Sequence, residues 1–577
     1  MGRSSRRGRD ARHVTVDGDS RHGRGVERSL SSRLKLGTAV QQVGETAVAM
    51  KTAAVCIGLV GVCGTIGSLV AGAADRPASL RVVSQRRDAQ GARLREPIVL
   101  EPAKTAVVVI DMWDKHWCET YTARVARLVP RMNRALEAAR KLGMCVVFAP
   151  SDVVDFYRDF AQRKAMQALP RRAQPKRVGF DAPPPPGPTD CCECGPDQPC
   201  KDKRKVWTRQ HPDLKIAQQD WIADCNNGQE LLNLCAERGI DTLVYMGVAS
   251  NLCVQFRSMG VRNMKDHGLR TLVVADLVEA ITSNGLDAAG KKDLNFTPAG
   301  GTARVQRHLE QFVCPTIESR ALIDAAGMNP HAADPRPHVV FVTAEKEYET
   351  HKTLPEFAKG CLGWCRATFL NATANEGEGK DSVPGLEALD DADLLVLSAR
   401  RRALPVVEMD HLERYIRAGK PLVALRTSTA AFQPKEAPRG HVIWDRFDLE
   451  VLGCNYAGYN PKSRLTGCDV WRLPEAADHP IVKDLSPDRW HSPSWIYRVR
   501  PMAEGVTVLM MGRWSDADPE EPVAWTRHYE GGRVFFTSLG HPGDFQMTPF
   551  RQLLANAIRW ALGDPVALDR APKPTLN

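Results

Sequence analysis

Two side chains that lie far apart in the sequence could together carry out nucleophilic chemistry. Cys253 stands in the segment Gly-Val-Ala-Ser-Asn-Leu-Cys-Val, which follows a predicted strand and opens a predicted helix. A thiol at a helix N-terminus meets unpaired N–H groups and the positive end of the helix dipole, so we expect a lowered pKa and a thiolate. The same N–H groups could stabilise an oxyanion. The alternative is that Cys253 is a small core residue.

The second of these side chains is Asp111, which comes directly after the run 105–110. Its continuous β-branched residues are typical of a strand buried on both faces of a parallel sheet. In such sheets the functional site lies at the carboxyl ends of the strands, so Asp111 and Cys253 should meet at one edge. A carboxylate there could carry the proton from the sulfur to a leaving group.

Strands and helices alternate along the chain, which predicts right-handed crossovers and helices on both faces of a sheet. In the first half the predicted strands are 105–110, 144–149, 242–246 and 271–275, and the predicted helical segments are 125–136 and 229–237. In the second half the predicted strands are 338–343, 392–398, 421–425 and 532–539, and the predicted helices are 406–418 and 550–562. The fold class is therefore α/β, with two three-layer domains and mainly parallel sheets.

The segments AVVVIDMWDKHW and GVASNLCVQ, about 140 positions apart, resemble the isochorismatase-like cysteine hydrolase superfamily over about residues 96–320. That family includes nicotinamidases, N-carbamoyl amino-acid amidohydrolases and isochorismatase. The resemblance implies that Cys253 is the nucleophile and Asp111 the general acid/base in cleavage of an amide or a similar C–N or ester-like bond. It also implies a cis peptide bond between Val248 and Ala249, which turns an N–H toward the oxyanion.

The third catalytic residue departs from the family pattern. The family has a Lys at the end of the strand before the nucleophile strand, and alignment of strand ends puts Arg209 there, with Lys215 as a second candidate. Arg supplies charge but cannot shuttle a proton at neutral pH. This departure keeps a second interpretation open, in which the chain is a catalytically inactive protein that binds a ligand or a partner.

The sequence predicts no metal or other cofactor. Nicotinamidases of this superfamily carry a metal site made of an Asp-x-His pair and a downstream His; Asp114 and His116 have the spacing of that pair, but no matching full ligand set is expected here. We therefore interpret His116 and His211 as ordinary polar residues rather than ligands.

The second half contains PVAWTRHYEGGRVFFTSLGHPGDF and then PFRQLLANAIRWAL, which are similar to the ThuA-like (trehalose-utilisation) family over about residues 337–563. The resemblance implies the fold of class I glutamine amidotransferases, which is flavodoxin-like. At the turn where an amidotransferase carries its Cys this chain has Arg426, so no glutaminase reaction is expected. Arg426, Tyr456 and His541 are candidate ligand-binding residues, and a carbohydrate ligand is implied by the resemblance alone.

The N-terminal part contains the three-part order of a secretory signal peptide. One Lys precedes an uncharged apolar run that ends in small residues, so we predict a signal at 50–74, cleaved near Ala73 or Ala74. We interpret Met50 as the true start, with 1–49 as a disordered upstream extension. The expected location is periplasmic or secreted. Without cleavage, the run 52–70 is long enough to anchor the protein in a membrane.

The remaining segments complete the predicted domain organisation. We expect a linker at 75–95, a hydrolase domain at 96–322, a linker at 323–337, a ThuA-like domain at 338–563 and a disordered tail at 564–577. A Pro-rich stretch carries four cysteines that could form disulfides: Cys191, Cys192, Cys194 and Cys200. Metal binding is the alternative, but their spacing is not a standard zinc pattern.

The charge distribution argues against a nucleic-acid partner. The formal charge is +10, and residues 1–49 alone carry ten basic and five acidic groups. In the rest of the chain, basic groups outnumber acidic groups only slightly. That part of the chain therefore has no concentrated positive charge of the kind that binds a polyanion. The expected partners are a small amide-like substrate and a carbohydrate ligand, and a homo-oligomer is left open.

Overall fold

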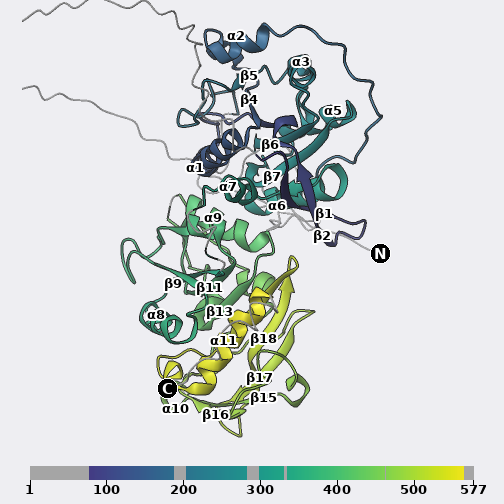
Figure 1. Cartoon of the computed structure of the whole chain (residues 1–577). Coiled ribbons are helices and arrows are strands. Elements are labelled where there is room, and N and C mark those ends of the chain that lie inside the picture. Colours follow the sequence, from purple (N-terminus) through teal and green to yellow (C-terminus); the bar gives the residue numbers. More distant parts are fainter. Residues whose placement is uncertain are drawn as a thin grey trace, which may run out of the picture. The chain divides into compact units, whose positions relative to one another are not determined.

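The computed structural model describes residues 77–186, 200, 203–282, 298–329, 334, 336–438, 440–459, 461 and 463–563. The predicted upstream extension, signal peptide and tail lie outside these residues, as do Cys191, Cys192 and Cys194. The described residues form two α/β domains, each built on its own sheet (Figure 1), so the predicted fold class is confirmed.

The first domain is built on a sheet of eight strands among the described residues, in the order β2-β1-β8-β7-β6-β3-β4-β5. The strands from β8 to β5 are parallel, whereas β1 pairs antiparallel with both β2 and β8. Their bounds are β1 Leu80–Arg87, β2 Arg93–Leu100, β3 Thr105–Ile110, β4 Cys145–Ala149, β5 Trp221–Ile222, β6 Thr242–Val248, β7 Arg270–Glu279 and β8 Thr316–Ile317.

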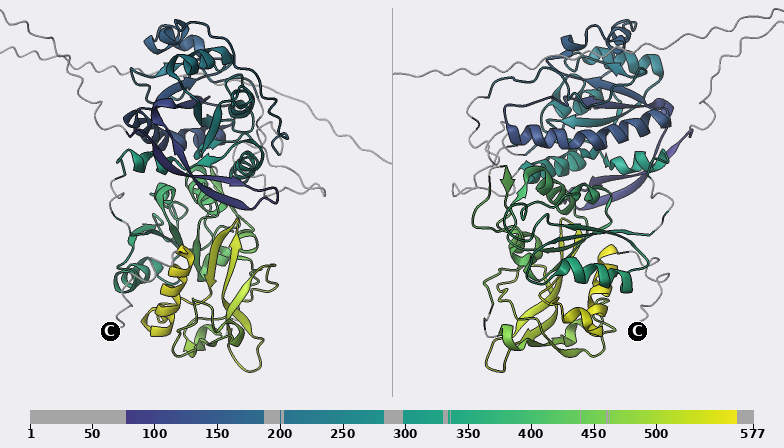
Figure 2. Two further views of the ribbon diagram at one scale, coloured as in Figure 1. Left: turned by 45° about the vertical axis from the view of Figure 1, so that its right-hand side comes forward. Right: turned by 90° about the vertical axis from the view of Figure 1, so that its left-hand side faces the viewer.

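Helices lie on both faces of this sheet, with α1 and α7 on one side and α3 and α5 on the other (Figures 1 and 2). The bounds are α1 Glu119–Leu142, α2 Ala161–Gln167, α3 Gly228–Arg238, α4 Cys253–Phe256, α5 Val261–Asp266, α6 Pro298–His308 and α7 Ser319–Ala325. Left-handed glycines end α1 at Gly143 and α3 at Gly239, as helix C-caps commonly do. The helices make the connections between parallel strands, as predicted.

The prediction of a linker at 75–95 is wrong for most of its length, because β1 and β2 form an antiparallel hairpin at the edge of the sheet. The alternation along β1 buries Leu80, Val82 and Ser84 and exposes the residues between them. Such alternation is typical of a strand with one solvated face. The segment resembles a linker in the sequence because many positions on the solvated face of the strand are polar.

The second domain is built on a sheet of nine strands among the described residues, in the order β10-β9-β11-β13-β19-β18-β17-β15-β16. The strands from β10 to β19 are parallel, and the rest of the sheet continues antiparallel. Their bounds are β9 His338–Ala344, β10 Arg366–Asn371, β11 Leu394–Ala399, β13 Leu422–Leu425, β15 Cys468–Arg472, β16 Arg489–Ser492, β17 Thr507–Arg513, β18 Glu521–Tyr529 and β19 Gly532–Thr537.

Two hydrophobic clusters hold helices against this second sheet. One packs α8 and α11 on one face, and the other packs α9 on the opposite face. The helix bounds are α8 Thr350–Cys361, α9 Val406–Arg417, α10 Ser463–Thr466 and α11 Thr548–Leu562, and a separate two-stranded ladder pairs β12 Leu404–Pro405 with β14 His441–Val442. The domain therefore has the predicted three layers.

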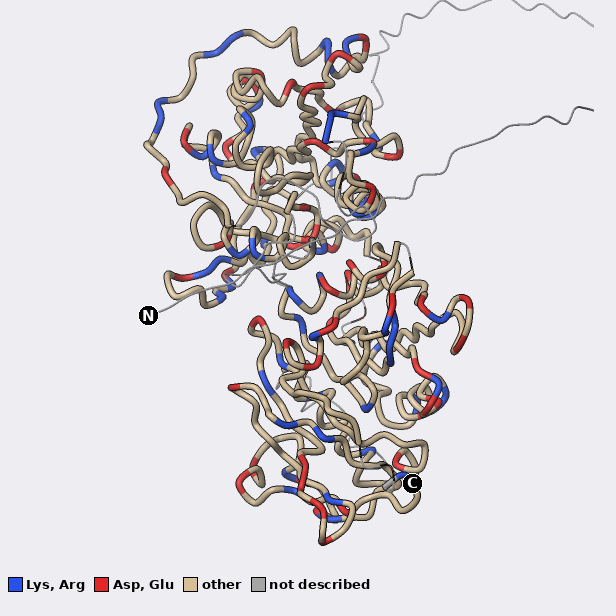
Figure 3. The backbone as a smooth tube through the Cα atoms, turned by 180° about the vertical axis from the view of Figure 1, so that it is seen from behind, with Lys and Arg blue, Asp and Glu red and all other residues tan. Residues whose placement is uncertain are grey.

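Basic and acidic residues are interspersed along the tube of both domains in the view of Figure 3, which fits the charge count of the sequence. Among the residues that the structure describes, no helix combines the length and the apolar character that crossing a bilayer requires.

Candidate active site

Asp111 is held at the carboxyl end of β3 by the end of its parallel neighbour β4. Ile110 pairs with Ala149, so the residues that follow these two strands share one edge of the sheet. The backbone N–H of Ser151 donates to Oδ1 of Asp111 at 2.6 Å, and the Ser151 hydroxyl lies 2.6 Å from both carboxylate oxygens. Asp111 also has a positive φ of 48°, a conformation that is rare outside turns and functional sites.

The pKa of Asp111 is set by two opposing influences. The side chain is fully buried, and burial raises its pKa because it disfavours the charged form. The hydrogen bonds from Ser151 lower the pKa, since they stabilise the carboxylate, but the net shift is upward. A carboxylate with a raised pKa is well suited to accept a proton and later return it.

The strand that leads to Cys253 approaches β3 more closely than any side chain would allow. Gly247 pairs with Ile110, and a Cβ added to Gly247 would lie 1.9 Å from the carbonyl oxygen of Ile110. Gly247 also has a φ of +123°, which is accessible to glycine alone at little cost. This close approach brings the loop after β6 beside Asp111.

The loop between β6 and α4 is fixed by two hydrogen bonds from one side chain. The amide of Asn251 donates to the carbonyl of Ile281 at 2.6 Å, and its oxygen accepts from the N–H of Ile281 at 2.9 Å. Asn251 is itself almost fully buried. The loop therefore presents Cys253, the first residue of α4, in one defined position.

Cys253 does not gain the lowered pKa expected from a helix N-terminus. The helix α4 has only four residues, so its dipole is small. Burial raises the pKa of Cys253, and the nearby Asp111 raises it further, whereas Arg257 lowers it; the net shift is upward. The shift is opposite to the one expected from the sequence, because the thiol is buried beside the carboxyl group of Asp111.

The positive charge beside the thiol is supplied by Arg257, four residues after Cys253. Its guanidinium interacts with the sulfur through a hydrogen bond and through charge. Its Nη1 donates to Oδ1 of Asn226 at 2.9 Å, and its Nη2 lies 3.1 Å from Oδ2 of Asp152. These two contacts orient the guanidinium at the mouth of the site.

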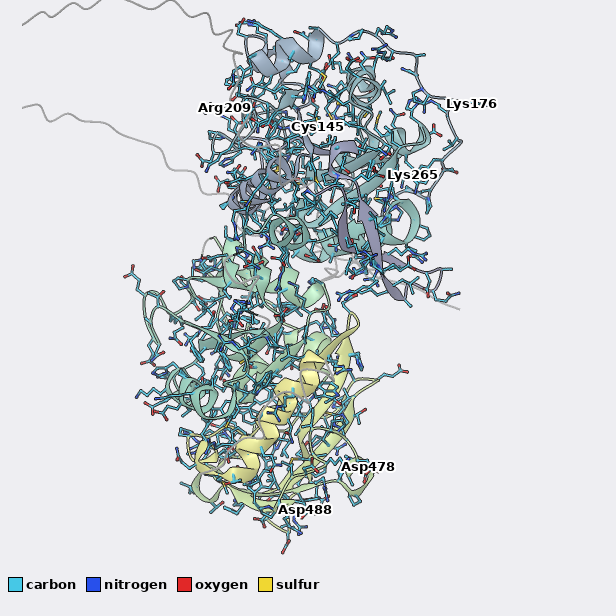
Figure 4. All side chains as sticks on the ribbon, viewed as in Figure 1. Cys145, Lys176, Arg209, Lys265, Asp478 and Asp488 are labelled. Atoms are coloured by element: carbon cyan, nitrogen blue, oxygen red, sulfur yellow. The ribbon has the colours of Figure 1, made fainter. Side chains whose placement is uncertain are left out.

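The structure does not bring Arg209 or Lys215 to the sulfur. The guanidinium of Arg209 lies 5.5 Å from the ring centroid of Phe156, and Figure 4 shows Arg209 at the margin of the domain. The side chain of Lys215 is exposed. The strand before the nucleophile strand is β5, Trp221–Ile222, so the alignment of strand ends that selected Arg209 is wrong.

The expected oxyanion donors are arranged differently from the family pattern. The described residues contain two cis peptide bonds, and each of them precedes a proline. The bond between Val248 and Ala249 is therefore trans. Val248 ends β6, and the N–H of Ala249 donates to the hydroxyl of Tyr121 at 2.9 Å. The backbone N–H of Cys253 forms no hydrogen bond with another described residue, so it is available as a donor to an oxyanion.

No group of three or more His, Cys, Asp or Glu side chains in the described part of the chain is arranged to hold a metal ion. His116 stacks with an indole ring, at 5.9 Å between its ring centroid and that of Trp207. Burial lowers the pKa of His211.

In the second domain, the three candidate residues gather around shared aromatic rings. The guanidinium carbon of Arg426 lies 5.2 Å from the ring centroid of Tyr497, and the ring of Tyr456 lies 5.2 Å from the same ring. The ring of His541 lies 6.1 Å from that of Trp495, which is also within 4.7 Å of the Arg426 guanidinium carbon. Arg426, Tyr456 and His541 therefore belong to one cluster.

Two residues of the first site were not predicted from the sequence. Ser151 follows the predicted strand 144–149 by two positions, so a search of all strand ends in the parallel sheet could have found it. Arg257 lies one helical turn after Cys253, and the spacing of four residues is the signal that places the two side chains on one face. The family pattern drew attention to a neighbouring strand instead.

Comparisons with known proteins agree with both halves of the chain. A family model described as an isochorismatase domain matches residues 105–303, and one described as ThuA, trehalose utilisation, matches residues 338–561. The comparison with curated proteins finds no match.

Solved structures similar to each half include three with low sequence identity. A putative ThuA-like protein from Parabacteroides merdae is 17% identical, with coverage of 40% of this chain and 90% of that one and a TM-score of 0.30. An isochorismatase from Pseudomonas putida is 17% identical, with coverage of 39% and 92% and a TM-score of 0.23. N-carbamoylsarcosine amidase from Thermoplasma acidophilum is 17% identical, with coverage of 37% and 96% and a TM-score of 0.20.

Proposed function

We propose that this chain, which joins an isochorismatase domain to a ThuA domain, is a cysteine hydrolase. It would cleave an amide or a related C–N or ester-like bond. The observation that carries the proposal is the meeting of Asp111, Cys253 and Arg257 at the carboxyl edge of the first sheet. A nucleophile that lies beside both a base and a positive charge has the parts that acyl transfer needs.

The first half of the reaction begins from a protonated thiol and a carboxylate. Asp111 takes the proton of Cys253 as the sulfur attacks the carbonyl carbon, so no free thiolate has to persist in the buried site. Arg257 stabilises the negative charge on sulfur during this transfer. The N–H of Cys253 donates to the oxyanion of the tetrahedral intermediate. Collapse of the intermediate forms a thioester, and Asp111 gives its proton to the departing nitrogen.

In the second half, water hydrolyses the thioester. Asp111, again a carboxylate, takes a proton from the water as its oxygen attacks the thioester carbon. The carbon–sulfur bond breaks, the acid product leaves, and the proton held by Asp111 returns to the sulfur. The raised pKa of Asp111 suits a group that must accept and release a proton in each half of the cycle.

The wider role belongs to the same proposal. The ThuA domain binds a carbohydrate-like ligand through the cluster around Arg426, and the chain works as an exported protein after removal of the segment 50–74. Export is supported by the signal-like order of that segment.

A second candidate function is a protein that binds a ligand without turnover. The observation that favours it is the absence of a Lys at the family position together with the raised pKa of Cys253. The two functions share the fold and differ in chemistry.

The deciding experiment measures ammonia release from a panel of primary amides and N-carbamoyl compounds with the whole chain and with Cys253→Ala. The proposal expects turnover that Cys253→Ala abolishes, and a mass increase on Cys253 when the reaction is quenched early. The matched control is Cys145→Ala, which removes a thiol from β4 of the same domain. Turnover that survives Cys253→Ala contradicts the mechanism, whereas binding without any turnover favours the second function.

A further inference from the structure

The cluster around Arg426 lies at an edge where ligands commonly bind. The parallel strands β9, β11, β13 and β19 all end there. Arg426 follows β13 directly and has a positive φ of 46°, in the left-handed region that is uncommon for non-glycine residues. In open sheets of this kind the crevice beyond the carboxyl ends holds the ligand.

The guanidinium of Arg426 is buried without a negative partner. The side chain is 0% exposed, and it forms no ion pair with any described carboxylate. Asp544 acts on it only through charge, and both oxygens of Asp544 already accept hydrogen bonds, from Ser492, Ser494, Gly540 and His541. A buried charge without a counter-charge is costly, so a bound anion would relieve the cost.

The unused donors of Arg426 form one particular edge of its guanidinium. Nη1 donates to the carbonyl of Ser538 at 2.6 Å, and the phenol of Tyr348 also interacts with the guanidinium, whereas Nε and Nη2 are buried and form no hydrogen bond of normal geometry with a described residue. Nε and Nη2 share the edge of the planar group that meets a carboxylate with two parallel hydrogen bonds. The free edge therefore selects a planar, two-oxygen anion.

Aromatic rings surround the same group. The guanidinium carbon lies 4.0 Å from the ring centroid of Tyr348 and 4.7 Å from that of Trp495. Trp495 and His541 are half-buried whereas Tyr348 is buried, so Trp495 and His541 form the solvent-facing side of the cluster. Aromatic side chains with a few fixed polar groups are the usual lining of a small-molecule site.

Further positive charge lies on the rim. Arg400 and Arg401 follow β11, and their charges act on the phenol of Tyr456. Arg400 is paired with Glu347, so Arg401 is the rim cation that can attract an anion toward the cluster.

We propose that the ThuA domain binds a carboxylated sugar, with its carboxylate paired to the Nε and Nη2 edge of Arg426 and its ring against Trp495. This inference rests on the proposed carbohydrate role of the domain and adds the chemical class of the ligand. The aromatic rings alone could stabilise Arg426 as a structural cation. The experiment must therefore separate ligand recognition from stability.

The test measures the binding of four probes to the full chain by calorimetry: D-glucuronate, D-glucuronamide, D-glucose and glucose 1-phosphate. Glucuronate should bind roughly tenfold or more tightly than glucuronamide and glucose, since it alone offers a carboxylate to the guanidinium edge. This comparison needs no variant, so it stands even if a change at Arg426 impairs folding.

The variants give the second measurement. Arg426→Gln should reduce glucuronate binding to the level of glucuronamide, and Arg426→Lys should give an intermediate value because it keeps the charge but not the fork. Arg489→Gln is the matched control, because Arg489 is an exposed arginine that stacks on Trp471 at the far edge of the sheet. It should leave the preference unchanged.

The remaining outcomes overturn the inference in distinguishable ways. Equal binding of glucuronate and glucuronamide removes the anionic class but leaves the carbohydrate role. Tighter binding of glucose 1-phosphate than of glucuronate replaces the carboxylate with a phosphate. Binding of none of the sugars contradicts both the inference and the carbohydrate role. If folded Arg426→Gln still prefers glucuronate to glucuronamide, Arg426 has a structural role and does not recognise the carboxylate.

Discussion

The charge that Arg257 brings to Cys253 should be measurable by its removal. Arg257→Gln takes away the one influence that lowers the pKa of the thiol and supports negative charge on sulfur. We expect kcat/KM to fall by about 10² to 10³, the usual range for loss of one donor that stabilises developing charge. Alkylation of Cys253 by iodoacetamide at a fixed alkaline pH should slow in the same variant, because a smaller fraction of the thiol is ionised.

Two comparison variants make the assignment of this charge specific. Arg209→Gln and Lys215→Gln remove the two cations that the family pattern selected, and neither side chain acts on the sulfur. Both should keep most of the activity. A loss at Arg209 or Lys215 as large as that at Arg257 would show that the positive charge comes from another place in the catalytic state.

Ser151 should set the acidic limb of the pH profile. Asp111 must be a carboxylate to take the proton of Cys253, and the Ser151 hydroxyl lowers the pKa of that carboxyl group. In Ser151→Ala this stabilisation is lost and the pKa rises further, so less carboxylate is present at a given acidic pH. The acidic limb of kcat/KM should therefore move to higher pH, with little change on the plateau.

The control for this shift is Ser84→Ala. Ser84 is a buried serine of the same sheet whose hydroxyl donates to the carbonyl of Glu96 on the hairpin. Its removal should leave the position of the acidic limb unchanged. A profile of Ser151→Ala that falls uniformly at all pH values would point to a lost geometry rather than a shifted pKa.

At the scale of elements, the contact between β3 and β6 decides whether the site can form. In Gly247→Ala the new Cβ would fall 1.9 Å from the carbonyl oxygen of Ile110, and the residue would keep a φ that alanine avoids. We expect the free energy of unfolding to drop by about 3 kcal/mol or more, since a backbone clash cannot be relieved by a rotamer change. Chemical denaturation measures the loss.

Gly239 provides a matched control at the end of α3. It also has a positive φ, of +66°, but an added Cβ would meet nothing within 4 Å. Gly239→Ala should therefore cost only about 1 kcal/mol, the conformational part of the penalty. Equal losses at Gly247 and Gly239 would mean that conformation, and not the close approach of the two strands, limits the site.

The strands that carry the site were predictable because buried parallel strands are continuous apolar runs. The run 105–110 agrees with the bounds of β3, and the position of Asp111 follows from it. The hairpin of β1 and β2 was missed because a solvated face makes half of its residues polar. The contact of Arg257 with Cys253 was missed because the family pattern places the positive charge on a neighbouring strand, whereas here it comes from the residue that caps the end of α4.

At the scale of the molecule, the order of the two domains could be predicted from two separate sets of motifs, and the family models confirm it. Their ligands could not be predicted in the same way. Which edge of the Arg426 guanidinium stays unpaired depends on which of its nitrogens donates to the carbonyl of Ser538. That choice is a property of the folded loop. Sequence patterns report strands and helices, whereas unsatisfied donors appear only in three dimensions.

Removal of the segment 50–74 should leave a complete first domain. Cleavage after Ala74 would start the mature chain at Asp75, five residues before β1 begins at Leu80. The register in which Leu80 pairs with Leu100 is then intact. When the chain from Met50 is expressed in a bacterium with a periplasm, we expect a soluble periplasmic product whose N-terminus, by mass spectrometry, follows Ala73 or Ala74. An uncleaved product in the membrane fraction would instead show that the run 52–70 is an anchor. An uncleaved product in the cytosol would contradict the export hypothesis.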